Sequence, residues 1–175
     1  MGIFNRRRHP SYHRPMQATS NTPYNRAAQM AQQNNSANTL PLKDYGPNPF
    51  AIHIDSATKS NPNFRTTLWT GPFLQITLMS IPPGGEIGLE MHSDVDQFIR
   101  LEAGEGLVMM GNSPNNLDFK QRVGDGDAFV IPSNTWHNLI NIANTPIKLY
   151  SIYTPPQHPF NTVHETKADA DAAEN

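Results

Sequence analysis

The chain of 175 residues contains no cysteine, which excludes disulfides, thiolate metal sites and a cysteine nucleophile. Any metal ligands must therefore be imidazole, carboxylate or amide side chains. The sequence also lacks an apolar run long enough to span a membrane, and no apolar segment follows the first arginines as it would in a secretory signal peptide. We expect a cytoplasmic protein with no membrane partner.

Charged residues make up only 16% of the chain, and their signs are unevenly distributed along it. Residues 1–47 hold six Lys or Arg against the single Asp44, whereas the remainder holds seven basic and fourteen acidic side chains. The first part is rich in Asn, Gln, Ser, Thr and Pro and has no periodic apolar face. It cannot bury enough apolar surface to offset its ordering entropy, so we predict a flexible arm over residues 1–47.

The cluster Arg6, Arg7 and Arg8 leaves three roles open for this arm. It could bind nucleic acid or another anionic surface, it could be a solvated tail, or it could dock on the acidic body of a neighbouring subunit. The positive run is short, and the acidic remainder of the chain would repel a polyanion. A solvated tail is therefore favoured, and no nucleic-acid partner is expected.

From Pro49 onward, short alternating or apolar runs are separated by turn residues, a pattern typical of an all-β jelly roll or small barrel. The 16 prolines and 11 glycines also suit many short strands better than long helices. The expected strands cover residues 50–54, 64–69, 73–81, 87–92, 97–101, 106–110, 117–123, 127–131, 136–142 and 147–154. We predict a barrel over residues 48–156 and a tail over 157–175, with a short Ala-rich helix at 166–174.

Two stretches of the predicted barrel carry side chains that could bind one metal ion. Glu90 and His92 are two residues apart and would share one face of a strand, and Gln97 would begin the returning strand. His137 lies on a later alternating strand. Burying Glu90 without a counter-charge would cost several kcal/mol, which favours a divalent ion over an empty polar core. Gln97 could be a ligand or could hydrogen-bond to one.

The first stretch resembles the first of the two signature motifs of the cupin family. Gly84, the pair Glu90 and His92, Gln97 and Gly104 keep every spacing of that motif. Two residue types differ, because Glu90 stands where the family has His and Gln97 stands where it has Glu.

The second stretch resembles the second cupin motif. Gly126, Pro132, His137 and Asn141 match it, and Asn134 replaces a Gly of the family pattern. Asn is the commonest substitute for Gly where φ must be positive, so we expect Asn134 to keep the turn.

The resemblance implies the cupin barrel, a double-stranded β-helix. It also implies that Glu90, His92, Gln97 and His137 bind one divalent ion (Zn, Mn or Fe), and that the protein forms a homodimer. The wider sequence looks like small bacterial cupins described as mannose-6-phosphate-isomerase-like. This likeness suggests a metal-dependent, isomerase-like enzyme acting on a small polar molecule such as a sugar or sugar phosphate, with Glu90 moving protons.

Two other functions stay open at this point. Two imidazoles and one carboxylate are also the ligand set of Fe(II) dioxygenases. Alternatively, the protein could be a non-catalytic cupin that binds a ligand or builds an assembly through its arm. Among the remaining residues, Arg100 and Glu102 should face away from the metal, and His158 and His164 are assigned to the surface, although either could fold over the barrel mouth.

Overall fold

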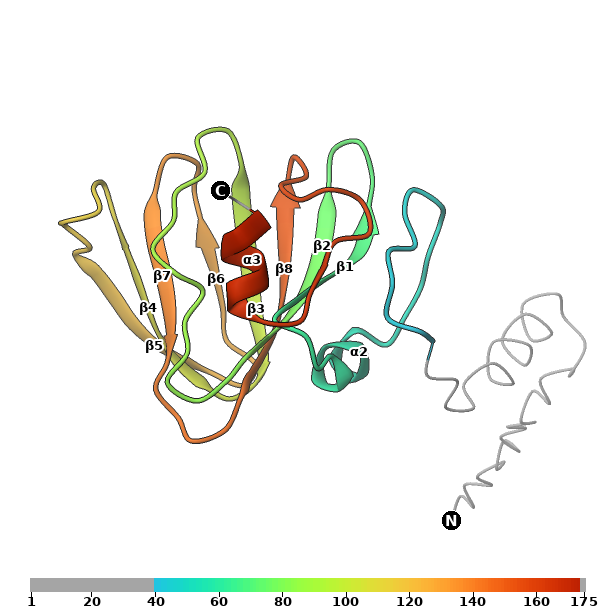
Figure 1. Cartoon of the computed structure of the whole chain (residues 1–175). Helices are drawn as coiled ribbons and strands as arrows, with labels where there is room; N and C mark the ends of the chain where they lie inside the picture. The colour runs from blue at the N-terminus through green and yellow to red at the C-terminus, as the bar shows by residue number, and fades with distance from the viewer. Residues whose placement is uncertain (1–39, 174–175) are drawn as a thin grey trace, which may run out of the picture. The chain divides into compact units, whose positions relative to one another are not determined.

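The computed structural model describes residues 40–173, which form two β-sheets and two short helices (Figure 1). Eight of the expected strands are confirmed, with ends that shift by at most two residues. Residues 1–39 of the predicted arm lie outside the described part, so their flexibility stays a prediction. Residues 40–47 instead pack on the barrel, where Asp44 is 6% exposed and the Tyr45 N–H donates to the Leu68 carbonyl oxygen at 2.9 Å. The prediction of an arm is therefore wrong for these residues. Neither helix within residues 40–173 is long and apolar enough to cross a membrane.

The larger sheet has six strands in the order β6-β3-β8-β2-β1-β9, and all neighbouring strands are antiparallel. Since β3 pairs with β8 and not with β2, the chain follows a jelly-roll path and not a simple meander. The strands of this sheet are β1 (Arg65–Thr70), β2 (Gln75–Ile81), β3 (Asp96–Ala103), β6 (Ala128–Ile131), β8 (Ile147–Thr154) and β9 (Val163–His164). The two-residue strand β9 was not predicted.

The smaller sheet contains β5 (Phe119–Gly124), β4 (Glu105–Gly111) and β7 (Trp136–Asn141), in that order. Residues 86–90 run beside β7 and make only two isolated bridges, Glu86 to Ile140 and Glu90 to His137. The prediction of a regular strand at 87–92 is therefore wrong. Gly88 has a φ of 110° and gives its N–H to the Asn138 side chain, at 3.0 Å, which interrupts the ladder.

An apolar core fills the space between the inner faces of the two sheets. It includes Met79, Ile81, Leu101, Leu139 and Leu149, each at most 1% exposed. The alternating burial along β8 and β4 is the period-two pattern of strands that present one face to a core. The predicted barrel thus forms because these strands bury every second side chain.

The outer face of the larger sheet is covered by α2 (Ile54–Ser60), whose Ala57 packs with Leu68 and Leu78. The prediction of a strand at residues 50–54 is wrong, because Ile54 begins this helix. The His53 side chain accepts a hydrogen bond from the Ser56 N–H and caps the first turn. A short apolar run does not distinguish a buried helix from a strand, which explains the error.

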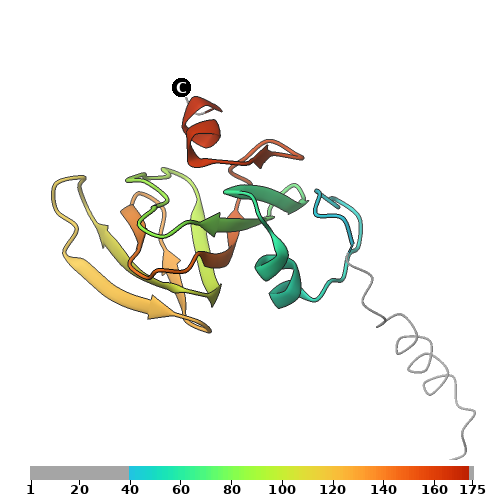
Figure 2. The ribbon, with the colours of Figure 1, turned by 60° about the horizontal axis from the view of Figure 1, so that its bottom comes forward.

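The C-terminal segment ends in α3 (Lys167–Ala173), which confirms the predicted short helix. Thr166 and Asp169 hydrogen-bond each other's backbone N–H groups at 3.2 and 2.9 Å and so form a capping box. Ala170 of α3 is 3% exposed and belongs to the core cluster. Figure 2 shows α3 and the chain that leads to it along one side of the sheets.

Candidate metal centre

Three of the four expected ligands converge at one end of the barrel interior. Glu90 Oε1 lies 3.2 Å from His137 Nε2 and 3.4 Å from His92 Nε2. One donor atom from each residue can be chosen so that all three atoms lie within 4.8 Å of one another. The backbone bridge between Glu90 and His137 places these two side chains together, and His92 is two residues from Glu90. An antiparallel bridge therefore joins the two stretches that carry the motifs.

The orientation of the side chains at this cluster suits a cation. His137 Nδ1 lies 2.9 Å from the Thr135 carbonyl oxygen, which can only accept, so Nδ1 carries the hydrogen and Nε2 faces Glu90. Burial raises the pKa of the Glu90 carboxyl, but hydrogen bonding with His137 and His92 outweighs burial and lowers it below its usual range. An ionised carboxylate thus faces two ring nitrogens. A divalent cation would satisfy these donor atoms together.

Gln97, the fourth expected ligand, lies on the inner face of β3 and is 1% exposed. Its Nε2 donates to Ser151 Oγ at 2.9 Å, and Ser151 Oγ in turn donates to the Phe98 carbonyl oxygen at 3.3 Å. This chain fixes the orientation of the amide. Gln97 Oε1 has no hydrogen-bond partner among the described residues and is therefore the atom that could face a metal.

The turns of the two motifs have the backbone conformations that the motifs require. Gly84, Gly104 and Gly126 have φ values of 70°, 91° and 85°, and Asn134 has a φ of 61°, as predicted for its Gly-like role. The Asn134 N–H donates to the His92 carbonyl oxygen at 2.7 Å. The turn of the second motif thus holds the ligand segment of the first.

A polar layer continues beyond these ligands along the inner faces of β2 and β8. Thr77, Ser151 and Tyr153 are each 0% exposed, and the sequence analysis did not identify them. The centroids of the Tyr153 and His92 rings are 6.1 Å apart. Burial raises the pKa of Tyr153, which remains a neutral phenol. The sequence signal that could have identified these residues is a polar side chain at an inward position of a strand whose other inward side chains are apolar.

His158 also joins this layer, so its assignment to the surface is wrong. The Gln75 amide accepts from the His158 N–H at 2.9 Å and donates to the His158 carbonyl oxygen at 2.8 Å. The His158 ring lies edge-on to the Tyr153 ring, and the two ring centroids are 5.1 Å apart. Burial and the charge of Arg65 lower the pKa of His158 to about 3, so its ring is neutral. His164 pairs with Arg65 in the β9 and β1 ladder and is partly buried.

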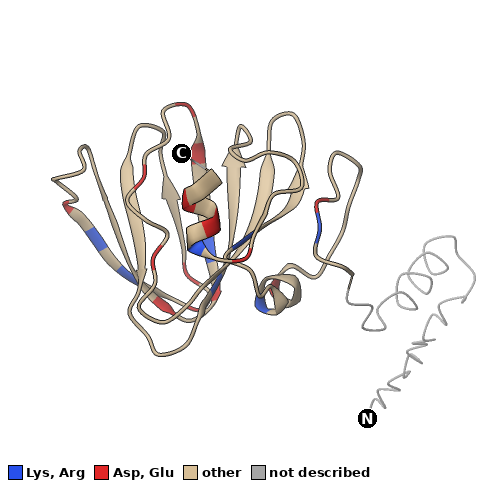
Figure 3. Ribbon diagram, viewed as in Figure 1, with Lys and Arg blue, Asp and Glu red and all other residues tan. Residues whose placement is uncertain are grey.

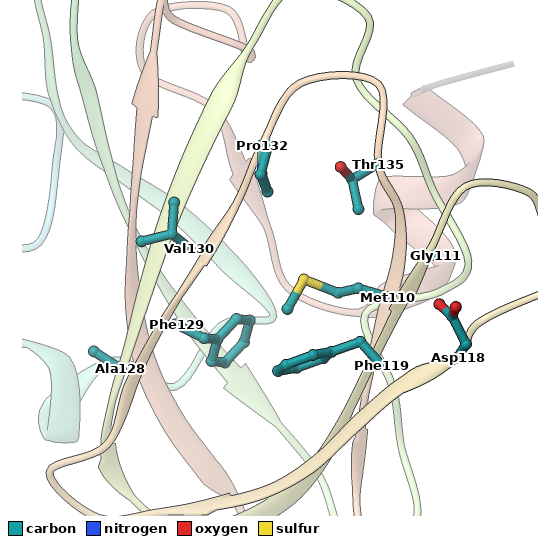
Figure 4. Close-up of a pocket in the computed structure, with 9 residues that line it drawn as sticks. All are labelled: Met110, Gly111, Asp118, Phe119, Ala128, Phe129, Val130, Pro132 and Thr135. Carbon is teal, nitrogen blue, oxygen red and sulfur yellow. The ribbon is translucent and has the colours of Figure 1, made fainter.

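A shallow apolar groove lies between β5 and β6, the edge strands of the two sheets (Figure 4). The side chains of Met110, Phe119 and Phe129 point toward one another in this groove. The residues that line it include none of the four expected ligands. The groove is thus separate from the candidate metal centre.

Charged residues of the described part of the chain are scattered along the sheets, loops and α3 (Figure 3). Arg100 and Glu102 form an ion pair with each other, as expected for residues that do not serve the metal. Asp96, next to Gln97, accepts a hydrogen bond from the Ser133 N–H at 2.9 Å and helps to join the two motif turns.

Comparisons with known proteins agree with this geometry. Residues 77–153 match the family model described as a cupin domain. The chain is 61% identical over 136 residues to the uncharacterized protein YrkC of Bacillus subtilis, covering 78% of this chain and 73% of that protein. It is 40% identical over 111 residues to the uncharacterized protein L612 of Acanthamoeba polyphaga mimivirus, covering 63% and 68%.

Among solved structures, BH2720 from Bacillus halodurans is 57% identical to this chain, with a TM-score of 0.74. The match covers 74% of this chain and 98% of that protein.

Proposed function

Because this chain belongs to the cupin family, we propose that it is a metal-dependent enzyme whose Glu90, His92 and His137 bind one divalent cation, with Gln97 beside them. The observation that carries the proposal is the approach of two imidazole nitrogens, at 3.2 and 3.4 Å, to one oxygen of an ionised carboxylate. The proposed reaction is isomerase-like and acts on a small polar molecule.

A bound divalent cation would supply Lewis acidity to a carbonyl or hydroxyl group of the substrate. The protein residues would orient the reactants. Thr135 holds the His137 ring through Nδ1, and Ser151 holds the Gln97 amide. Glu90 has a lowered pKa and is ionised at neutral pH, so it could accept a proton but not donate one. In its position between two imidazoles, Glu90 serves best as a metal ligand.

Elemental analysis and activity measurements test this proposal together. Purified protein should be stripped with a chelator, reloaded separately with Zn²⁺, Mn²⁺ or Fe²⁺, and assayed for bound metal, thermal stability and interconversion of sugars and sugar phosphates. We expect stoichiometric metal, a raised Tm on loading, and turnover that disappears with chelator. Failure of all three ions to bind would refute the proposal.

The neutral Gln97 favours a second candidate, a cupin that binds metal and ligand without catalysis. At position 97 this chain has a neutral amide where the family motif has a carboxylate, and a carboxamide oxygen is a weaker ligand than a carboxylate. Metal that raises the Tm without turnover of any substrate would support this function. Fe²⁺-dependent consumption of oxygen would instead identify a dioxygenase.

A further inference from the structure

The barrel interior beside the metal centre contains more unpaired polar atoms than the three converging ligands account for. Thr77 Oγ1, Tyr153 OH and His158 Nε2 are buried, and none has a hydrogen-bond partner among the described residues. Buried polar groups in native proteins are almost always paired with protein, ordered water or a ligand. These three atoms lie on β2, β8 and the C-terminal segment, so three separate parts of the chain supply them.

The three side chains form one cluster around Tyr153. Thr77 lies directly across the β2 and β8 ladder from Ser151, and the hydroxyls of both approach Tyr153 OH without a hydrogen bond of good geometry. The His158 and His92 rings lie 5.1 and 6.1 Å from the Tyr153 ring. Tyr153 therefore connects the cluster to the metal centre through His92.

The chemistry of the cluster favours a negatively charged partner. The hydroxyls of Thr77 and Tyr153 can each donate a hydrogen bond, and the Tyr153 phenol is neutral. Arg65 is 2% exposed, lies on the inner face of β1 opposite Met79, and its positive charge acts on both Tyr153 and His158. A divalent cation with Glu90 as the single carboxylate among the converging ligands would add net positive charge.

We propose that Thr77, Tyr153 and His158, with Arg65 nearby, bind the anionic oxygen group of a small carboxylate or phosphate ligand at the metal centre. This inference rests on the proposed function and specifies its substrate class. The C-terminal segment takes part directly, because the Gln75 side chain holds the backbone of His158 through two hydrogen bonds. Recognition thus requires the tail that follows the barrel strands.

Calorimetric titration of the metal-loaded protein with three probes tests the proposal. Glycolate and inorganic phosphate carry the two anionic groups, and ethylene glycol is a neutral molecule of similar size to glycolate. We expect one of the anions to bind at least tenfold more tightly than ethylene glycol. Glycolate alone would identify a carboxylate, and phosphate alone would identify a phosphate ester.

Two isosteric variants give the decisive comparison. Tyr153→Phe and Thr77→Val each remove one unpaired hydroxyl, so they should weaken anion binding at least tenfold while metal content stays unchanged and the Tm does not fall. Tyr150→Phe on the same strand is the matched control, because Tyr150 lies on the other face and should not affect the anion.

Several results would overturn the inference. The first is that neither anion binds to protein that holds its metal. The second is that Tyr153→Phe binds the anion as tightly as the wild type. The third is a lower Tm for Tyr153→Phe, which would mean that the hydroxyl has a structural partner. Protein that holds no metal but still binds an anion through Tyr153 would instead refute the metal proposal and support the proposed anion site. The proposed metal site and the proposed anion site can therefore be refuted independently.

Discussion

The same three strands build both ends of the barrel interior, yet the two ends differ in chemistry. At one end, the inward residues are Ile81 of β2, Leu101 of β3 and Leu149 of β8, all fully buried. At the other end, the inward positions hold Thr77, Gln97 and Tyr153, equally buried. On each strand the inward side chains change from apolar to polar within four residues, while the backbone remains a β-strand.

The difference separates the part of the interior that stabilises the fold from the part for which we propose metal and ligand binding. A fully buried Leu or Ile contributes about 1.5–3 kcal/mol, whereas each unpaired buried hydroxyl costs about 1–3 kcal/mol. A barrel needing stability alone would have apolar residues at both ends. The polar end therefore has a cost in stability that a ligand and a metal ion would offset.

Truncation in the apolar end should have the largest effect on stability. Leu149 is 0% exposed, and Leu149→Ala should lower the free energy of unfolding by about 2–5 kcal/mol, because it removes buried methyl groups and leaves a cavity. Thr77→Val in the polar end should cost nothing or stabilise. Urea unfolding of both variants measures the contrast, and equal losses would mean that the two ends do not differ in this way.

Removal of a metal ligand should have the next largest effect. His92→Ala or His137→Ala should abolish stoichiometric divalent metal and remove the stabilisation that metal gives, about 2.7 kcal/mol at a concentration one hundred times the Kd. His53→Ala is a control, because His53 caps α2 on the outer side of the larger sheet. Elemental analysis and thermal unfolding with and without chelator measure both effects. Undiminished metal content in both ligand variants would contradict the assignment.

The neutral state of His158 predicts a smaller, pH-dependent effect. Its folded pKa of about 3 lies below the ordinary value of 6.5, so the unfolded chain binds more protons between these values. Stability should fall as the pH drops from about 6.5 towards 3, by at most about 1.4 kcal/mol per pH unit for one proton. Chelator-treated wild type and His158→Gln should be compared between pH 5 and 7. Parallel curves would show that His158 is not held neutral.

Much of the barrel could be predicted because period-two burial is a local signal. The alternation in β8 and the glycines with positive φ at both motifs are visible in the sequence, and the structure agrees with both. The helix at Ile54 was not predictable in this way, since its capping by His53 and its packing on Leu68 and Leu78 are tertiary features.

The candidate site was predictable only where a motif fixed the spacing. Glu90, His92 and His137 meet as expected, although their binding of metal is still a proposal. Tyr153 was missed although it lies at an inward position of the β8 alternation. His158 was missed because its position depends on how the segment after β8 folds back and is held by Gln75. No local pattern marks a side chain that becomes buried through a contact so distant in the sequence.

The smallest predicted effect concerns Gln97, which lies at the boundary between the metal ligands and the polar layer. Gln97→Glu would add an anionic ligand and should tighten divalent-metal binding by about tenfold, or about 1.4 kcal/mol. It would also remove the N–H that Ser151 accepts, but Ser151 can turn its hydroxyl to donate to the new carboxylate. The second negative charge should weaken the bound ion as a Lewis acid and oppose the positive field at Tyr153. Metal affinity should therefore rise while anion binding and turnover fall. Metal and glycolate titrations of both proteins measure this opposition, and unchanged metal affinity would place Gln97 outside the coordination sphere.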